Sequence, residues 1–89
     1  MSRYTVVWRD VALDELAQIR VESKDRARVT AAIASIDAEL ANDPPAKGEE
    51  LHEGLRMFRS STLHVLFEVQ ELDRLVRVVE VRSARQAGE

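Results

Sequence analysis

Cysteine is absent from this sequence of 89 residues, which excludes disulfides, thiolate nucleophiles, zinc knuckles and iron–sulfur clusters. No apolar run approaches the roughly 20 residues that a membrane-spanning helix needs, so we expect no membrane insertion. Residues 1–5 contain no apolar signal core, which together with the lack of cysteine predicts a cytoplasmic protein. One Trp, one Tyr and two Phe are too few for an aromatic platform that stacks on nucleic-acid bases.

The composition is that of a single small globular domain, which we expect to span residues 1–89. Apolar residues make up 45% and charged residues 33%, and the net charge of −3 argues against a general nucleic-acid coat protein. Residues 55–89 nevertheless contain six arginines and no lysine. Guanidinium groups suit phosphate and carboxylate, but alternating Arg and Glu also decorate solvated sheet faces, and the sequence leaves both interpretations open.

The N-terminal half predicts one strand and two helices. Residues 4–9 are rich in β-branched and aromatic types, which predicts a strand. Apolar residues then recur every three or four positions, predicting one helix from the N-cap Asp10 to about Arg20 and another from the N-cap Asp25 to about Ala41. Because the two helices are close in sequence, we expect them to form an antiparallel hairpin.

The C-terminal half predicts a loop and then three strands. The prolines in residues 42–45 end the second helix, and residues 46–54 predict a polar loop ending in glycine. Residues 55–59, 63–69 and 74–82 predict strands joined by short turns, which favour an antiparallel meander.

These elements predict an α+β fold in two layers, with an N-terminal strand, an antiparallel helical hairpin and a three-stranded antiparallel meander (β-α-α-β-β-β). The helices cover one face of the sheet. We expect the other face to stay partly open, either solvated by residues such as His64, Glu68 and Arg77 or used for binding. Open faces and edges of a sheet invite a partner, including a second copy of the chain.

Arginines and one histidine on the predicted strands are the residues that could carry chemistry. In a metal-free nuclease, arginines hold the scissile phosphate and a histidine, whose ordinary pKa is near neutrality, transfers protons. The catalytic candidates are His64, Arg59, Arg82 and Arg85, and the candidates for binding nucleic acid or a partner are Arg56, Arg59, Arg77, Arg82 and Arg85. The alternative is that His64 is a half-exposed strand residue without chemistry, and strand register decides which face it occupies.

No metal and no cofactor are expected. The two histidines, His52 and His64, are twelve residues apart, and no carboxylate pair lies at ligand spacing from either. The three glycines are isolated, so the chain contains no glycine-rich phosphate loop.

The block Gly48–Arg59 contains a glycine loop and a Leu-Arg-Met-Phe-Arg strand, residues 63–69 read Leu-His-Val-Leu-Phe-Glu-Val, and residues 74–82 are rich in valine. Together, over residues 4–85, these segments resemble the RelE/ParE superfamily of bacterial toxins. The resemblance implies a RelE/ParE-like fold and the toxin half of a type II toxin–antitoxin (plasmid stabilisation) pair, neutralised by a cognate antitoxin. One branch of the superfamily cleaves mRNA in the ribosome without a metal, and another poisons DNA gyrase.

Most catalytic positions of the ribonuclease branch are not matched. Its basic residues on the strand before the turn fall on Leu55 and Met57, and Arg56 between them points to the opposite face. Its arginine on the next strand falls on His64, its C-terminal catalytic arginine falls near Ala84, and its final tyrosine has no counterpart.

Three hypotheses therefore remain open. The chain is a toxin-like component that acts on gyrase or translation, a ribosome-dependent endoribonuclease with altered active-site residues, or a non-enzymatic member of the fold that acts as a binding module or homodimer.

Overall fold

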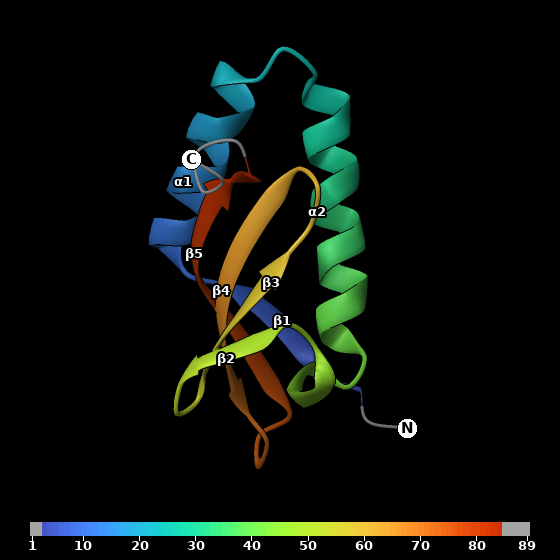
Figure 1. The fold of residues 1–89 in the computed structure, drawn as a ribbon, viewed down its shortest axis with the longest axis vertical. Coiled ribbons are helices and arrows are strands. Elements are labelled where there is room, and N and C mark those ends of the chain that lie inside the picture. Colours follow the sequence, from blue (N-terminus) through green and yellow to red (C-terminus); the bar gives the residue numbers. More distant parts are fainter. Residues whose placement is uncertain (1–2, 85–89) are drawn as a thin grey trace.

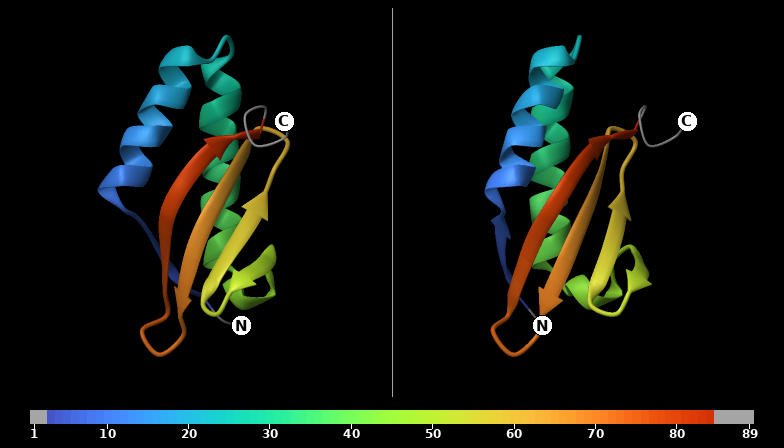
Figure 2. Two further views of the ribbon diagram at one scale, coloured as in Figure 1. Left: turned by 60° about the vertical axis from the view of Figure 1, so that its left-hand side comes forward. Right: turned by 90° about the vertical axis from the view of Figure 1, so that its left-hand side faces the viewer.

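The computed structural model describes residues 3–84, which form a five-stranded mixed sheet with a helical hairpin on one face (Figure 1). The elements are β1 (Thr5–Trp8), α1 (Asp10–Glu22), α2 (Arg26–Ala41), the 3-10 helix η1 (Pro44–Ala46), β2 (Glu49–His52), β3 (Leu55–Arg59), β4 (Leu63–Gln70) and β5 (Leu75–Ser83). The strand order is β1-β5-β4-β3-β2, with β1 parallel to β5 and the other neighbours antiparallel. The predicted two-layer α+β fold is confirmed, and Figure 2 shows both helices on the same side of the sheet.

The helices begin and end close to the predicted positions. Arg9, rather than Asp10, is the N-cap of α1, and Asp10 lies in the first turn, where the helix dipole favours a carboxylate. The predicted cap of α2 is confirmed, because the Asp25 side chain accepts a hydrogen bond from the Arg28 backbone N–H (3.1 Å). No helix between residues 3 and 84 is long and apolar enough to cross a membrane.

The hydrophobic core lies between the helical hairpin and the sheet. Phe67, Ile36 and Leu40 are its largest fully buried side chains. The other buried apolar residues are Ala12, Leu16, Val29, Leu63, Val65, Val76, Val78 and Val81. Alternation along β4 directs every second side chain into this core, as its sequence predicts, and the residues between face the open side of the sheet.

Residues 46–54 contain a strand where the sequence predicted a polar loop. β2 pairs antiparallel with β3, with Glu49 opposite Met57, so the antiparallel part of the sheet has four strands instead of three. Gly48 adopts φ 66°, and a Cβ at this position would overlap the carbonyl oxygen of Met57. All four residues of β2 are exposed, so no apolar alternation marks this strand in the sequence.

The first strand of the chain pairs with the last. β1 lies parallel to β5, with Val6 opposite Val76 and Trp8 opposite Val78. The Trp8 side chain packs against the core, and its Nε1–H donates a hydrogen bond to Asp37 Oδ1 of α2 (2.8 Å). β1 is thereby joined to both layers, a position that the sequence did not specify.

Candidate functional site

Three of the four candidate catalytic residues lie side by side on the open face of the sheet. His64 on β4 is directly opposite Arg59 on β3 and Arg82 on β5. Directly opposed side chains lie on one face, with Cβ atoms roughly 4.5–5.5 Å apart. The β4 residues on either side of His64 are buried against the helices, so the row Arg59–His64–Arg82 faces away from them. The fourth candidate, Arg85, lies outside the described residues.

Both arginines of this row are already engaged by carboxylates. Arg59 Nη2 lies 2.7 Å from Glu49 Oε1 on β2, and Arg82 Nε lies 2.7 Å from Glu80 Oε2 on the same strand. The two glutamates cancel the charge of the two arginines. Among residues 3–84 the His64 side chain has no hydrogen-bond partner, whereas a catalytic histidine is normally oriented by a neighbouring group.

The other two arginines of the predicted binding set lie away from the row. Arg77 is on the open face of β5, and its Nη1 lies 3.6 Å from Glu68 Oε1 on β4. Arg56 is on the helix-facing side of β3, opposite the buried Phe67. Its guanidinium donates hydrogen bonds to the carbonyl oxygens of Lys47 (2.8 Å) and Gly48 (3.2 Å) and so fastens the segment that leads into β2.

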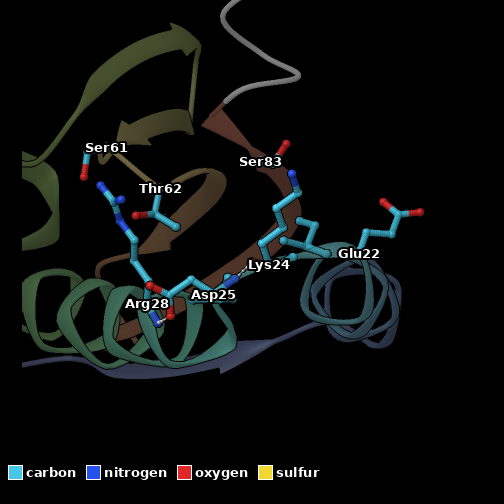
Figure 3. Close-up of a pocket in the computed structure, with 10 residues that line it drawn as sticks. Glu22, Lys24, Asp25, Arg28, Ser61, Thr62 and Ser83 are labelled. Atoms are coloured by element: carbon cyan, nitrogen blue, oxygen red, sulfur yellow. Dashed lines mark hydrogen bonds between the residues drawn. The ribbon is translucent and has the colours of Figure 1, made fainter.

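A pocket of about 450 Å³ lies at the tip of the helical hairpin, where the sequence had assigned no function. It forms where the connection between α1 and α2 approaches the β3–β4 turn and the end of β5 (Figure 3). Its lining residues are Ile19, Glu22, Ser23, Lys24, Asp25, Arg28, Val29, Ser61, Thr62 and Ser83. The volume is within the range of sites that bind small molecules or the side chains of a partner.

The two cations of this pocket extend across it from the hairpin. In Figure 3 the Arg28 side chain reaches toward Ser61 and Thr62, and the Lys24 side chain reaches toward Ser83. Within the part of the chain that the structure describes, neither the Lys24 ammonium nor the Arg28 guanidinium has a hydrogen-bond or ion-pair partner. Both groups are therefore available to an anionic group that enters the pocket.

The two carboxylates of the pocket are engaged within the chain. Asp25 accepts the capping hydrogen bond at the start of α2, and Glu22 Oε2 accepts one from Gln18 Nε2 (2.8 Å). The formal charge of the lining is zero, but its cations are available while its carboxylates already accept hydrogen bonds.

Next to the pocket, the edge of β5 beyond its pairing with β1 faces α1. β1 pairs with residues 75–78 of β5, and β5 continues to Ser83. Within this continuing part, the backbone N–H of Val81 donates a hydrogen bond to Glu15 Oε1 of α1 (2.9 Å). The two residues are 66 positions apart, and no local pattern in the sequence indicates that they meet.

No protein-family model and no curated protein matches the sequence. Solved structures do match it. A chain of the toxin–antitoxin complex RelBE2 from Mycobacterium tuberculosis superimposes with a TM-score of 0.78 at 20% identity, covering 93% of this chain and 93% of that chain. A chain of the chromosomal ParDE toxin–antitoxin system from P. aeruginosa superimposes with a TM-score of 0.67 at 14% identity, covering 93% of this chain and 98% of that chain. A mutant of the E. coli toxin RelE in the free state superimposes with a TM-score of 0.63 at 18% identity, covering 99% of this chain and 90% of that chain.

The architecture is therefore a two-layer α+β fold, in which a helical hairpin packs on a mixed sheet, and the chain shares it with these solved structures. More narrowly, the chain has the fold of the RelE/ParE superfamily, and the resemblance that the sequence indicated is confirmed at the level of the fold.

Proposed function

We propose that this chain is the toxin-like component of a bacterial type II toxin–antitoxin module, acting in the cytoplasm and neutralised by a cognate antitoxin. The observation that carries the proposal is the likeness in fold, over 93% of the chain, to chains of the RelBE2 and ParDE systems. The exposed strand β2, at the edge of the described sheet, adds support, because exposed strand edges are common docking sites for a partner.

The open face of the sheet favours a toxin that does not cleave RNA. Leu55 and Met57 share this face with the row Arg59–His64–Arg82, at positions where the ribonuclease branch of the superfamily has basic residues. Each arginine of the row already faces a glutamate. A phosphate would have to displace those carboxylates and would meet a face with no net positive charge. We therefore favour a target other than mRNA, such as DNA gyrase.

The row Arg59–His64–Arg82 supports a second candidate function, that of a ribosome-dependent ribonuclease. The Arg59–Glu49 pair is exposed, with side chains 60% and 57% accessible, whereas the Glu80 oxygen that faces Arg82 is buried. Exposed pairs contribute only about 0–1 kcal/mol, so a substrate phosphate could replace Glu49 at small cost. His64, between the two guanidiniums, would then be the proton-transfer group.

The test is bacterial growth after tight, inducible expression of the full chain. We expect growth arrest that is relieved when the small gene adjacent to this one is co-expressed. Normal growth with soluble protein accumulating would contradict the proposal and support the binding module or homodimer. To exclude a missing target in a foreign host, the same expression is repeated in the source organism.

Variants of the open face separate the two candidate targets. We expect His64→Ala and Arg82→Ala to arrest growth as the parent does, with intact cellular mRNA by primer extension and inhibited supercoiling in a gyrase assay. Arg77→Ala is the matched control, because Arg77 is also an arginine of the open face paired with a glutamate, but lies outside the row. If His64→Ala and Arg82→Ala lose arrest and mRNA cleavage while Arg77→Ala keeps both, the ribonuclease candidate is correct.

A further inference from the structure

The pocket at the tip of the helical hairpin has walls whose backbone is held by hydrogen bonds. On the hairpin side, Arg26 Nε donates to the carbonyl oxygen of Arg20 (3.2 Å) and so closes the connection between α1 and α2. On the sheet side, the Ala84 N–H donates to the carbonyl oxygen of Thr62 (2.9 Å) and ties the end of β5 to the β3–β4 turn. A site whose backbone is already ordered loses little conformational entropy when it binds a ligand.

Four side-chain donors of this pocket are unused among residues 3–84. They are the ammonium of Lys24, the guanidinium of Arg28 and the hydroxyls of Ser61 and Thr62. Ser60, by contrast, uses its hydroxyl to hold the backbone of the turn. Figure 3 shows the Arg28 side chain extending from α2 toward Ser61 and Thr62. One guanidinium and two hydroxyls therefore lie on one side of the pocket, and the Lys24 ammonium is a further donor.

The acceptors of the pocket are less available than its donors. The Asp25 carboxylate accepts the backbone N–H of Arg28 (3.1 Å), and Glu22 accepts a hydrogen bond from Gln18 (2.8 Å). In Figure 3 the Glu22 carboxylate points away from the side of the pocket that Arg28 occupies. The Arg28 N–H is not free, so the attraction for an anion comes from side chains of two separate segments and not from the start of α2.

A phosphate group matches this set of donors. The guanidinium fork binds two phosphate oxygens, and hydroxyls can donate to the third. A carboxylate has two oxygens and would leave donors of the pocket unused. The lining also contains an apolar part, because Val29 is 3% exposed and belongs to the core, and Ile19 packs against it. A pocket of about 450 Å³ has room for a phosphate and a small organic body.

The surroundings of the pocket favour a single phosphate over a nucleic-acid chain. Successive phosphates of a nucleic acid need a series of cations. Beside the pocket, between α1 and β5, lie the carboxylates of Glu15 and Glu22. Arg82 lines the same hollow, but it is already paired with Glu80. The phosphate next in a chain would therefore meet carboxylates.

We propose that the pocket at the tip of the helical hairpin binds a small molecule that carries a phosphate monoester. Arg28, Lys24 and the two free hydroxyls of the β3–β4 turn hold the phosphate, and the organic body contacts the apolar part of the lining. The proposal does not rest on the proposed function, because it uses only the side chains that line this pocket.

The test is a titration of the ¹⁵N-labelled full chain with phenyl phosphate, followed by the amide resonances. Phenylacetate, which carries a carboxylate on a similar ring, and inorganic phosphate, which lacks the ring, are the matched probes. We expect saturable shifts at Arg28, Ser61 and Thr62 with a Kd of about 1 mM, and binding at least about fivefold weaker for both matched probes. Equal binding of phenylacetate, or no saturable shift by about 20 mM phenyl phosphate, would overturn the proposal.

Substitutions of the donors test the assignment of the phosphate. Arg28→Gln should weaken phenyl phosphate binding about tenfold, Arg28→Lys about threefold and Thr62→Val about fivefold. Arg20→Gln is the matched control, because Arg20 is an exposed arginine of the same hairpin that does not line the pocket, and it should bind as the parent does. The Arg28 guanidinium has no partner among residues 3–84, so Arg28→Gln should keep the melting temperature of the unliganded parent. Unchanged binding by Arg28→Gln would contradict the site.

The positions of the shifted resonances distinguish this site from the open face of the sheet. Shifts confined to Arg59, His64 and Arg82 would place the phosphate on the open face and reject the pocket. A short 5′-phosphorylated RNA that shifts the amides of Ser61 and Thr62 at lower concentration than phenyl phosphate would overturn the choice of a small molecule.

Discussion

Gly48→Ala should detach β2 from β3, and the neighbouring Gly54→Ala provides a matched control. Both glycines have positive φ, 66° and 82°. For an alanine this conformation costs roughly 1–2 kcal/mol, offset by about 0.4–1 kcal/mol from the stiffer unfolded chain. At Gly54 no atom lies within 4 Å of an added Cβ. At Gly48 the Cβ would lie 2.8 Å from the carbonyl carbon of Met57, which is backbone and has no rotamer to change.

The difference between the two variants isolates this steric overlap. Overpacking costs about 1–3 kcal/mol, so we expect Gly54→Ala to lower the free energy of unfolding by about 1 kcal/mol and Gly48→Ala by about 2–4 kcal/mol. For a chain of 89 residues, each kcal/mol lowers the melting temperature by about 4–8 °C.

The assay is urea unfolding followed by the fluorescence of Trp8, the single tryptophan, which lies on β1. Amide exchange at Met57 and Glu49 reports on the β2–β3 pairing itself. Equal losses of stability in the two glycine variants, together with unchanged exchange at these amides, would refute the steric argument.

Three further substitutions test the core, a contact between layers, and a helix cap. Phe67→Ala should lower the free energy of unfolding by about 3–5 kcal/mol, because the ring is fully buried; a loss below about 2 kcal/mol in urea unfolding would contradict its place in the core. Trp8→Phe should lose about 0.5–1.5 kcal/mol with the hydrogen bond to Asp37, and combining it with Asp37→Ala should add little further loss in thermal unfolding. Asp25→Ala should lose about 1 kcal/mol and lower the helical circular dichroism, whereas Asp25→Ser should retain most of the cap.

The sequence predicted the helices and strands that bury one face in the core. It missed β2, which buries no face. In β4, Leu63, Val65 and Phe67 alternate with half-exposed residues, and the predicted strand 63–69 differs from the observed one by a single residue. β2 is an exposed edge strand held by backbone pairing and by arginine side chains, so its composition is that of a loop. The parallel pairing of β1 with β5 joins the two ends of the described chain, and nothing local specifies it.

The part of the candidate site on β3 and β4 was predictable, because a turn sets the register of these two strands. Ser60 lies in the short turn predicted between residues 59 and 63. Its side chain accepts hydrogen bonds from the backbone N–H groups of Thr62 and Leu63 and thereby fixes the β3–β4 register that sets Arg59 opposite His64. The carboxylates that engage these arginines, and the pocket at the tip of the helical hairpin, depend on how separate elements pack. The periodicity of a sequence indicates which face of a helix or strand is buried, but not which other elements pack against that face.

The position of β5 between β1 and β4 has a consequence for synthesis of the protein. α1 and α2 are complete once residue 41 has been made, yet the core that covers Leu16 and Ile36 also requires Val76 and Val78 from the strand made last. The N-terminal half therefore has no complete surface on which to fold while the rest is being translated. Pairings between the first and last strands are intrinsically slow to form. A partner or chaperone that meets the nascent chain meets it with its helices unpacked, and any activity of the folded domain begins only when β5 enters the sheet between β1 and β4.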